Sequence, residues 1–131
     1  MERKLLSIVA ADMVGFSRLV ENNEIEILKR QKKHFIEIIK PNVDKYTGRI
    51  IKTTGDGFLA TFESSMSAVE SSLIIQSKIN ELESMFNNDK RIWYRFGINI
   101  GDVVIDEDDI FGNSVNIASR LESIADPGGI S

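Results

Sequence analysis

Hydrophobic positions in the first third of the chain change from a short continuous run to a helical repeat. The apolar run at 5–11 predicts a strand that is buried on both faces. Between 17 and 46 apolar residues recur at helical spacing, and the Asn22-Asn23 pair predicts a break that divides this stretch into two helical pieces. The stripe expected to face the core consists of Ile25, Leu28, Phe35, Ile39 and Val43.

The middle of the chain predicts a hairpin followed by a helix. Residues 49–62 hold two β-capable segments about Asp56-Gly57, a dipeptide that is typical of a two-residue hairpin turn. Residues 64–86 carry apolar side chains at helical spacing, which predicts an amphipathic helix. The hairpin therefore leads directly into a helix that packs on the sheet.

The last third repeats this alternation of strands and helix. Residues 91–99 alternate like a strand, and Gly101-Asp102 is expected to turn the chain into a second strand. A last helix is predicted over 113–124. Interleaved hairpins and helices predict an α+β, ferredoxin-like fold, in which helices pack on one face of an antiparallel-rich sheet and the first strand lies centrally beside the hairpin.

The end of the sequence carries a further expectation about the domain. The chain ends on Gly-Gly-Ile-Ser directly after a turn, where a further strand would normally begin. We therefore expect residues 1–131 to form one domain that lacks its C-terminal closing strands. No apolar run approaches the length of a membrane span, so we expect no membrane contact by this segment.

Composition narrows the classes of function. The absence of cysteine excludes disulfides, thiolate metal sites and cysteine nucleophiles, and a cytoplasmic location is expected. The net charge of −4 argues against a duplex nucleic acid partner, which needs a basic stripe, but not against a nucleotide. The single histidine, His34, lies among lysines in a helical stretch, and we expect it on the surface rather than in catalysis.

Two aspartates stand at positions suited to chemistry. Asp12 follows the first strand and Asp56 lies at the hairpin turn, so a central first strand brings both to one edge of the sheet. Two carboxylates with open coordination positions suit Mg²⁺ that is shared with a phosphate chain, and the backbone N–H groups of 13–17 open a helix where phosphate oxygens can bind. Taken singly, Asp56 is explained as a plain turn residue, and Asp12 has the alternative explanation of a helix N-cap.

Other polar residues have both a functional and an ordinary explanation. Asn116 and Arg120 are four residues apart on one helix face, where an amide and a guanidinium can orient a sugar and neutralise a phosphate; the alternative is an ordinary surface arginine. The acidic stretch 106–109 is by default a solvated loop. Lys52 lies within an apolar hairpin strand and must find a sheet edge or a charged partner.

Three stretches, taken in order, resemble the class III adenylyl and guanylyl cyclases, and the match runs from about residue 5 to the end. The family's Asp-x-x-Gly-Phe-Ser/Thr element is present as DMVGFS at 12–17, and its Lys-x-x-Gly-Asp hairpin as KTTGD at 52–56. Its Asp-x-x-Gly-Asn-x-Val-Asn-x-Ala-x-Arg segment is present as DIFGNSVNIASR at 109–120. Each alone is weak, but three in order are specific and fit a bacterial-type adenylyl cyclase.

The resemblance implies roles for the metal-binding and catalytic residues. Asp12 and Asp56 would bind two Mg²⁺ or Mn²⁺ ions per site, which grip the triphosphate and lower the pKa of the ribose 3′-hydroxyl. Asn116 would orient the ribose, and Arg120 would stabilise charge at the α-phosphate. The backbone at the start of the first helix, Gly15, Phe16 and Ser17, would lie on the substrate.

Lys52 and Asp109 match the base-selecting pair of the family. Adenine offers an acceptor at N1 and a donor at its 6-amino group, which a lysine and an aspartate complement, whereas guanine has the reverse polarity. The resemblance therefore implies an enzyme that converts ATP to 3′,5′-cyclic AMP and pyrophosphate in signal transduction. A guanylyl cyclase, or a catalytically silent cyclase-like dimerisation or regulatory domain, are the alternatives.

The resemblance also implies an assembly. In this family the metal aspartates come from one subunit, and the base-selecting and Asn/Arg residues from the other. One chain here carries both sets, so a homodimer with two equivalent interfacial sites is implied. Regulatory or sensor domains are expected elsewhere in the full-length protein. Family domains continue past this end with closing strands and a basic residue for the β- and γ-phosphates, which puts full activity of residues 1–131 in doubt.

Overall fold

The structure, a computed structural model, describes all residues from 1 to 131. Strands and helices alternate much as the sequence predicts. In chain order the elements are β1 (Glu2–Met13), α1 (Phe16–His34), the π-helical segment η1 (Phe35–Ile39), α2 (Lys40–Lys45), β2 (Arg49–Thr53), β3 (Gly57–Phe62), α3 (Ser65–Glu83), β4 (Tyr94–Asp106), β5 (Asp109–Phe111) and α4 (Asn113–Ser123). None of these helices combines the length and the apolarity that crossing a membrane requires.

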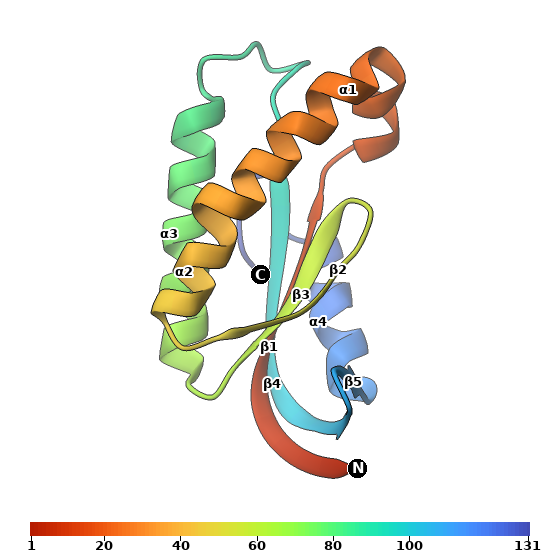
Figure 1. Ribbon diagram of the computed structural model, residues 1–131, viewed down its shortest axis with the longest axis vertical. Helices are drawn as coiled ribbons and strands as arrows, with labels where there is room; N and C mark the ends of the chain where they lie inside the picture. Colours follow the sequence, from red (N-terminus) through yellow and green to blue (C-terminus); the bar gives the residue numbers. More distant parts are fainter.

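The five strands form one sheet in the order β2-β3-β1-β4-β5, and every neighbouring pair is antiparallel. The first strand is central, as expected, and pairs along its whole length with β4 (Figure 1). Asp12, near the end of β1, lies opposite Gly57, the first residue of β3. At the C-terminus, Ile130 forms an isolated parallel bridge with Phe96 of β4. The central position of β1 is what brings its end to the hairpin.

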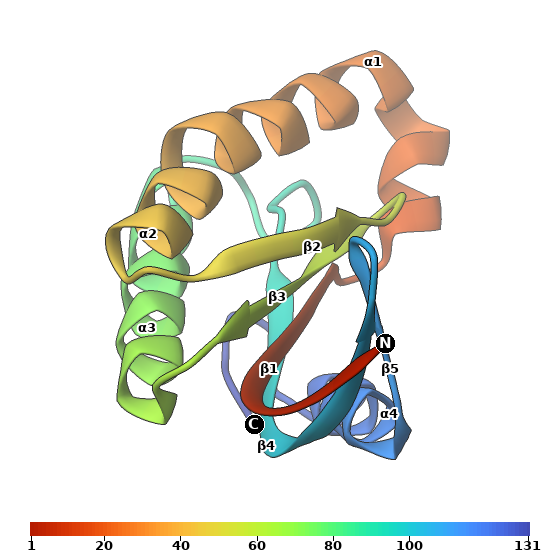
Figure 2. The same cartoon turned by 60° about the horizontal axis from the view of Figure 1, so that its bottom comes forward.

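Helices cover both faces of the sheet (Figures 1 and 2). The segments α1, η1, α2 and α3 cover one face and enclose a core of 17 buried residues, which includes Val9, Ala11 and Phe96. Helix α4 covers the other face, over a smaller core of seven buried residues that includes Ile8, Ala10 and Val103. The α+β fold class is confirmed, but the expectation that all helices pack on one face is wrong for α4, which covers the second apolar face of the sheet.

Helix α1 is interrupted as predicted, but it buries a different face. Asn23 has non-helical angles (φ −161°, ψ 83°), and its side-chain oxygen accepts a hydrogen bond from the N–H of Glu26 at 3.3 Å, which caps the second half of the helix. The predicted stripe is wrong at its start, because Ile25 and Leu28 are exposed and Ile27 is buried instead. Polar contacts of the second half explain this rotation.

His34 is buried, so its expected surface position is wrong. Its Nδ1 lies 2.9 Å from the Tyr94 hydroxyl, and its Nε2 lies 3.1 Å from a carboxylate oxygen of Glu83. The same carboxylate accepts a hydrogen bond from Arg30 and another from the N–H of Ile92 at 2.7 Å. A histidine with a partner at each ring nitrogen is stable inside the protein. This network fixes which side of α1 faces the sheet.

Two predicted turns are displaced. The chain does not turn at Gly101-Asp102, because β4 runs through both residues while it pairs with β1, and the reversal occurs at Glu107, which has a positive φ of 56°. The hairpin turn is centred on Gly55-Asp56, one residue earlier than predicted, since Thr54 donates its N–H to the Gly57 carbonyl at 2.9 Å. The β2–β3 hairpin therefore exists with a displaced tip, whereas the predicted hairpin about Gly101-Asp102 is wrong, because both of its segments belong to β4, which pairs with β5 instead.

Candidate functional site

Asp12 and Asp56 line one cavity of about 390 Å³ between the end of β1, the β2–β3 connection and α4. Lys52 of β2 lines it from the hairpin side, and Glu122 lines it from α4. Both aspartates are half-buried, whereas Glu122 is only 7% exposed. The cavity thus gathers three carboxylates and one ammonium group from elements that are distant in sequence.

Main-chain contacts place the two aspartates beside each other. The N–H of Met13 donates to the carbonyl of Asp56 at 2.7 Å, which ties the hairpin tip to the end of β1. Gly57 permits this approach, because a Cβ at this position would lie 1.8 Å from the carbonyl oxygen of Ala11. Asp12 belongs to β1 and not to a helix cap, so its interpretation as an N-cap is wrong.

Glu122 is a site residue that the sequence analysis missed. Burial raises the pKa of its carboxyl to about 8, and a hydrogen bond with Asp12 and the charges of Asp12 and Asp56 act in the same direction, against Arg95. Its signal in the sequence is its spacing of four residues from Ala118, which is fully buried on the same face of α4. An acidic residue within an apolar helical stripe indicates that the group packed against it is polar or charged.

The start of α1 lies at the same end of the sheet. Two of its expected free donors are engaged, because the N–H groups of Met13 and Val14 donate to the carbonyls of Asp56 and Trp93 at 2.7 and 2.8 Å. Gly15 is the N-cap, with a φ of 62° and no side-chain cap. The backbone donors that remain for an anion belong to the first residues of the helix: Gly15, Phe16 and Ser17.

Lys52 and Asp109 form an ion pair at 3.2 Å. They lie on β2 and β5, the two opposite edge strands of the sheet, which the curvature of the sheet brings together (Figure 2). A hydrogen bond from the N–H of Ile110 lowers the pKa of Asp109, and Lys52 lowers it further. Lys52 thus has both the edge position and the charged partner that its place in the sequence requires.

Asn116 and Arg120 lie on the exposed side of α4 and do not line the cavity. Residues Val115 and Ser119, one position before each, face it instead. The structure therefore brings Asp12, Asp56 and Lys52 together within one chain, with Asp109 paired to Lys52. It leaves the amide and the guanidinium on a separate surface.

Sequence comparison gives a single family over nearly the whole chain. Residues 2–131 match the model of the adenylate and guanylate cyclase catalytic domain. A Rhizobium meliloti (strain 1021) protein named as a candidate adenylate cyclase 3 is 39% identical over 128 residues, which are 98% of this chain and 22% of that protein. An adenylate cyclase of Streptomyces coelicolor is 35% identical over 120 residues, or 92% of this chain and 30% of that protein. The chain thus spans less than a third of these relatives.

Solved structures agree with the sequence comparison. An adenylate/guanylate cyclase/hydrolase from Silicibacter pomeroyi has a TM-score of 0.91 and 47% identity, covering 99% of this chain and 75% of that one. The catalytic core of a rhodopsin-guanylyl cyclase, solved with ATPαS, has a TM-score of 0.82 at 23% identity, covering 98% and 78% of the two chains, and supports the fold alone. The chain belongs to the adenylate and guanylate cyclase catalytic domain family.

Proposed function

We propose that this domain is an adenylyl cyclase that converts ATP to 3′,5′-cyclic AMP and pyrophosphate. The observation that carries the proposal is the division of the polar residues. Asp12 and Asp56 converge in one cavity, whereas Asn116 and Arg120 lie on an exposed face of α4 outside it. Such a division suits a reaction centre that two chains complete together.

Asp12 and Asp56 fit a pair of Mg²⁺ or Mn²⁺ ions shared with a triphosphate. Their combined charge contributes to the raised pKa of Glu122, so negative charge is concentrated at a place where cations would relieve it. The two aspartates would supply two carboxylate ligands, and phosphate oxygens would fill further coordination positions of the ions. The bound ions would supply Lewis acidity toward the phosphates and the ribose 3′-hydroxyl.

The residues of the chain would hold the substrate for in-line attack of the 3′-oxygen on the α-phosphorus. Asn116 would orient the ribose, and Arg120 would neutralise charge that develops on the α-phosphate. Backbone N–H groups at the start of α1 (15–17) would bind phosphate oxygens. Since little covalent chemistry falls to the protein, positioning and charge neutralisation would provide most of the catalysis.

Lys52 and Asp109 would select adenine. Their 3.2 Å ion pair holds a donor and an acceptor side by side, as the N1 and 6-amino edge of adenine requires. The names of the relatives from Rhizobium and Streptomyces, which are adenylate cyclases, support the same substrate. Discrimination against GTP would come from the unpaired polar groups that guanine would leave at this edge.

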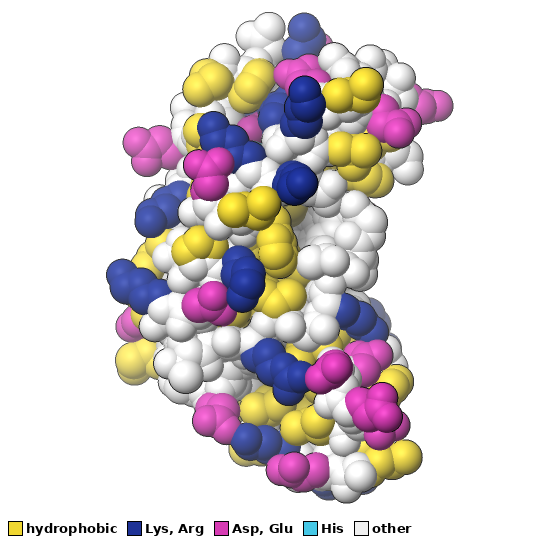
Figure 3. Space-filling view, in the orientation of Figure 1, with side chains coloured by type: hydrophobic (Ala, Val, Ile, Leu, Met, Phe, Trp, Pro, Cys, Tyr) yellow, Lys and Arg dark blue, Asp and Glu magenta, His cyan; other side chains and the backbone are white.

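We further propose the setting of the domain. A homodimer would place the Asn116 and Arg120 of one chain over the aspartates of its partner. The short share of each relative that the chain spans supports regulatory domains elsewhere in the full-length protein. A cytoplasmic location, without nucleic acid partners, would suit an ATP-consuming domain that has no cysteine. On the face shown in Figure 3, Lys and Arg are interspersed with Asp and Glu rather than gathered in a stripe.

The test is production of cyclic nucleotide by the purified chain with Mn²⁺ and either ATP or GTP, over a range of protein concentrations. We expect cyclic AMP to exceed cyclic GMP and to rise faster than linearly with protein. Asp12→Asn should abolish it, whereas Asp89→Asn, an exposed aspartate outside the cavity, should not. Cyclic GMP as the main product would overturn the proposed substrate. If this chain and a longer one were both inactive with ATP and with GTP, a catalytically silent cyclase-like domain would be the remaining alternative.

A further inference from the structure

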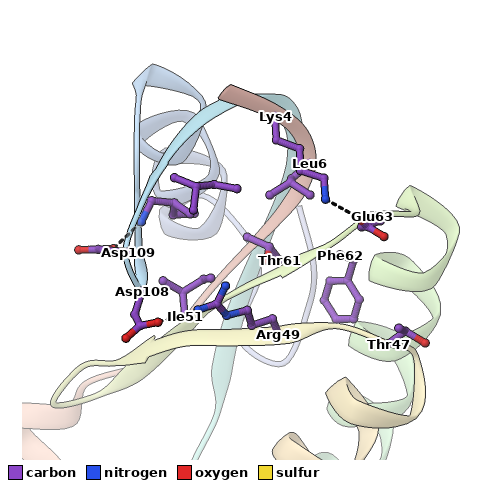
Figure 4. A pocket seen from close by; sticks show the side chains of 12 residues that line it. Lys4, Leu6, Thr47, Arg49, Ile51, Thr61, Phe62, Glu63, Asp108 and Asp109 are labelled. Atoms are coloured by element: carbon purple, nitrogen blue, oxygen red, sulfur yellow. Dashed lines mark hydrogen bonds and ion pairs between the residues drawn. The ribbon is translucent and has the colours of Figure 1, made fainter. Parts of the chain in front are cut away.

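A second cavity lies on the same face of the sheet as α4, toward the opposite end of β1 from Asp12. Its volume is about 200 Å³, and it opens between β2 and the β4–β5 connection (Figure 4). It shares no lining residue with the Asp12 and Asp56 cavity that we described above. Of the residues that line it, only Asp109 has a role in the proposed reaction.

The floor of the cavity is apolar except for one hydroxyl. Its apolar lining comes from three strands and the β5 hairpin: Leu6, Ile51, Phe62, Ile105 and Ile110. Among them lies Thr61, which is 5% exposed and labelled near the centre of Figure 4. The side-chain hydrogen bonds of the structure include none from the Thr61 hydroxyl. The Thr61 hydroxyl oxygen is not among the buried polar atoms that lack a partner, so it is accessible to solvent, and water or a ligand in the cavity can bond it.

The rim carries two exposed ion pairs, one on each side. Lys4 pairs with Glu63, and Arg49 pairs with Asp108 at 3.1 Å (Figure 4). In each pair the acid is the more exposed partner, with side-chain exposures of 72% against 42% and of 97% against 54%. The cationic groups are therefore the less exposed partners, although all four side chains line the cavity. Exposed pairs of this kind contribute only about 0–1 kcal/mol, so another anion can exchange into them.

We propose that this cavity binds a small apolar monocarboxylate, such as an aromatic or short-chain acid. The ligand carboxylate would pair with Arg49 in place of Asp108, since a planar guanidinium suits bidentate recognition of a carboxylate. The apolar body would cover Leu6, Ile51 and Ile110, and the Thr61 hydroxyl would donate to a ligand oxygen. The volume of about 200 Å³ suits a single ring or a short chain.

Binding would also reach the base-selecting pair, a consequence that rests on the proposed function. Asp108 precedes Asp109 in the β4–β5 turn, beside Glu107 with its positive φ. Only three residues of β5 pair with β4, so the ion pairs to Arg49 and Lys52 are the side-chain ties of this turn to β2. Release of Asp108 would loosen Asp109 and change the preference between ATP and GTP.

The binding test is independent of any enzymatic activity. Benzoate is titrated into the ¹⁵N-labelled chain, with benzamide as the neutral isostere and acetate as the charge without the ring. We expect saturable shifts confined to β2, the end of β3, the β4–β5 hairpin and the start of β1, with a Kd on the order of 1 mM for benzoate. Benzamide should bind at least about tenfold more weakly because it lacks the charge-assisted hydrogen bond, and acetate should do so because it lacks the apolar contact. Equal binding of benzamide, or shifts elsewhere, would overturn the proposal.

Variants separate the site from general salt effects. Arg49→Gln should weaken benzoate at least about tenfold, and the nearly isosteric Thr61→Val should weaken it by a smaller factor. Lys40→Gln, which breaks the exposed Lys40–Asp44 pair at 3.2 Å on α2, is the matched control and should bind as the parent does. Ile110→Phe fills the cavity and should abolish binding. Unchanged affinity in folded Arg49→Gln or Ile110→Phe chains would refute the site, whether or not the domain makes cyclic AMP.

Discussion

Gly97 sets the distance between β4 and α4. A Cβ at this position would lie 2.2 Å from the backbone nitrogen of Glu122 and 2.3 Å from the carbonyl oxygen of Ala118. These are rigid helix atoms, so the strand and the helix touch main chain to main chain. Because Glu122 reaches the Asp12 cavity from this helix, the missing side chain at Gly97 fixes one wall of the candidate site.

Gly97→Ala tests this contact. Overpacking of this kind costs about 1–3 kcal/mol, because neither backbone can move without breaking its own hydrogen bonds. Gly55→Ala is the control, since nothing lies within 4 Å of a Cβ at that position. Urea denaturation followed by circular dichroism should show the loss for Gly97→Ala and a change within about 0.5 kcal/mol for Gly55→Ala. Equal midpoints for both variants would contradict the close contact.

The proposed base-selecting pair, Lys52 and Asp109, gives a second prediction for single residues. The double exchange Lys52→Glu with Asp109→Cys reverses the donor and the acceptor at the edge that would face the base. We expect the ratio of activity with ATP to activity with GTP to fall by at least about tenfold, as loss of a polar match and creation of a mismatch require. Initial rates with each nucleotide measure this. An unchanged ratio would show that other residues read the base.

Single residues were predictable where a motif or a pattern marked them. Asp12 and Asp56 follow from a strand end and a hairpin turn, and the cavity brings them together. Glu122 and His34 were missed because each is a polar residue whose partners, Asp12 and Glu83, come from distant parts of the chain. The spacing of residues in the sequence shows which side chains share a face of one helix or strand. It does not show which side chains a neighbouring element brings to that face.

Among the elements, α1, α3 and β4 share one buried polar junction. Glu83 at the end of α3 is 1% exposed and accepts from Arg30 and His34 of α1 and from the N–H of Ile92 before β4. Burial by itself raises the pKa of this carboxyl, but the hydrogen bonds from His34 and Arg30 outweigh it and lower the pKa below its usual 4.5. The ionised form therefore holds the three elements together.

Glu83→Gln should remove this stabilisation and its pH dependence. Breaking a buried ion pair by removing one charge costs about 3 kcal/mol at neutral pH. Since the folded pKa lies below the unfolded one, the contribution is complete above pH 4.5 and is lost as the pH falls through the folded pKa. Urea midpoints should thus differ most near pH 7 and converge in acid. Glu81→Gln, an exposed neighbour on α3, should keep the parent profile.

The elements themselves were largely predictable because their periodicities are strong. The exceptions arise where pairing between elements overrides a local signal. The Gly101-Asp102 pair predicts a turn, but the pairing of β4 with β1 keeps β4 extended through both residues. Helical spacing predicts that Ile25 and Leu28 are buried. The contacts of Arg30 and His34 with Glu83 turn a different side of α1 toward the sheet, so both residues are exposed.

For the whole molecule, the proposed dimer makes a prediction that no monomer can satisfy. Asp12→Ala and Arg120→Ala remove groups that lie apart on one chain, in the cavity and on the exposed face of α4. Each variant alone should be inactive. A mixture should regain up to about one quarter of the parent rate, because half of the random dimers carry one intact site of two. A mixture as inactive as its components would refute sites shared between chains.

A helix with one non-helical residue bends where it is interrupted. The start of α1 is joined to the sheet through Val14, whose N–H donates to Trp93, whereas its second half is held by Arg30 and His34. Between these anchors Asn23 has no helical geometry to resist bending. A displacement of the far end of α1 would therefore change the angle between its two halves at Asn23. The N–H groups that open the helix beside Asp12 would keep their position relative to β1.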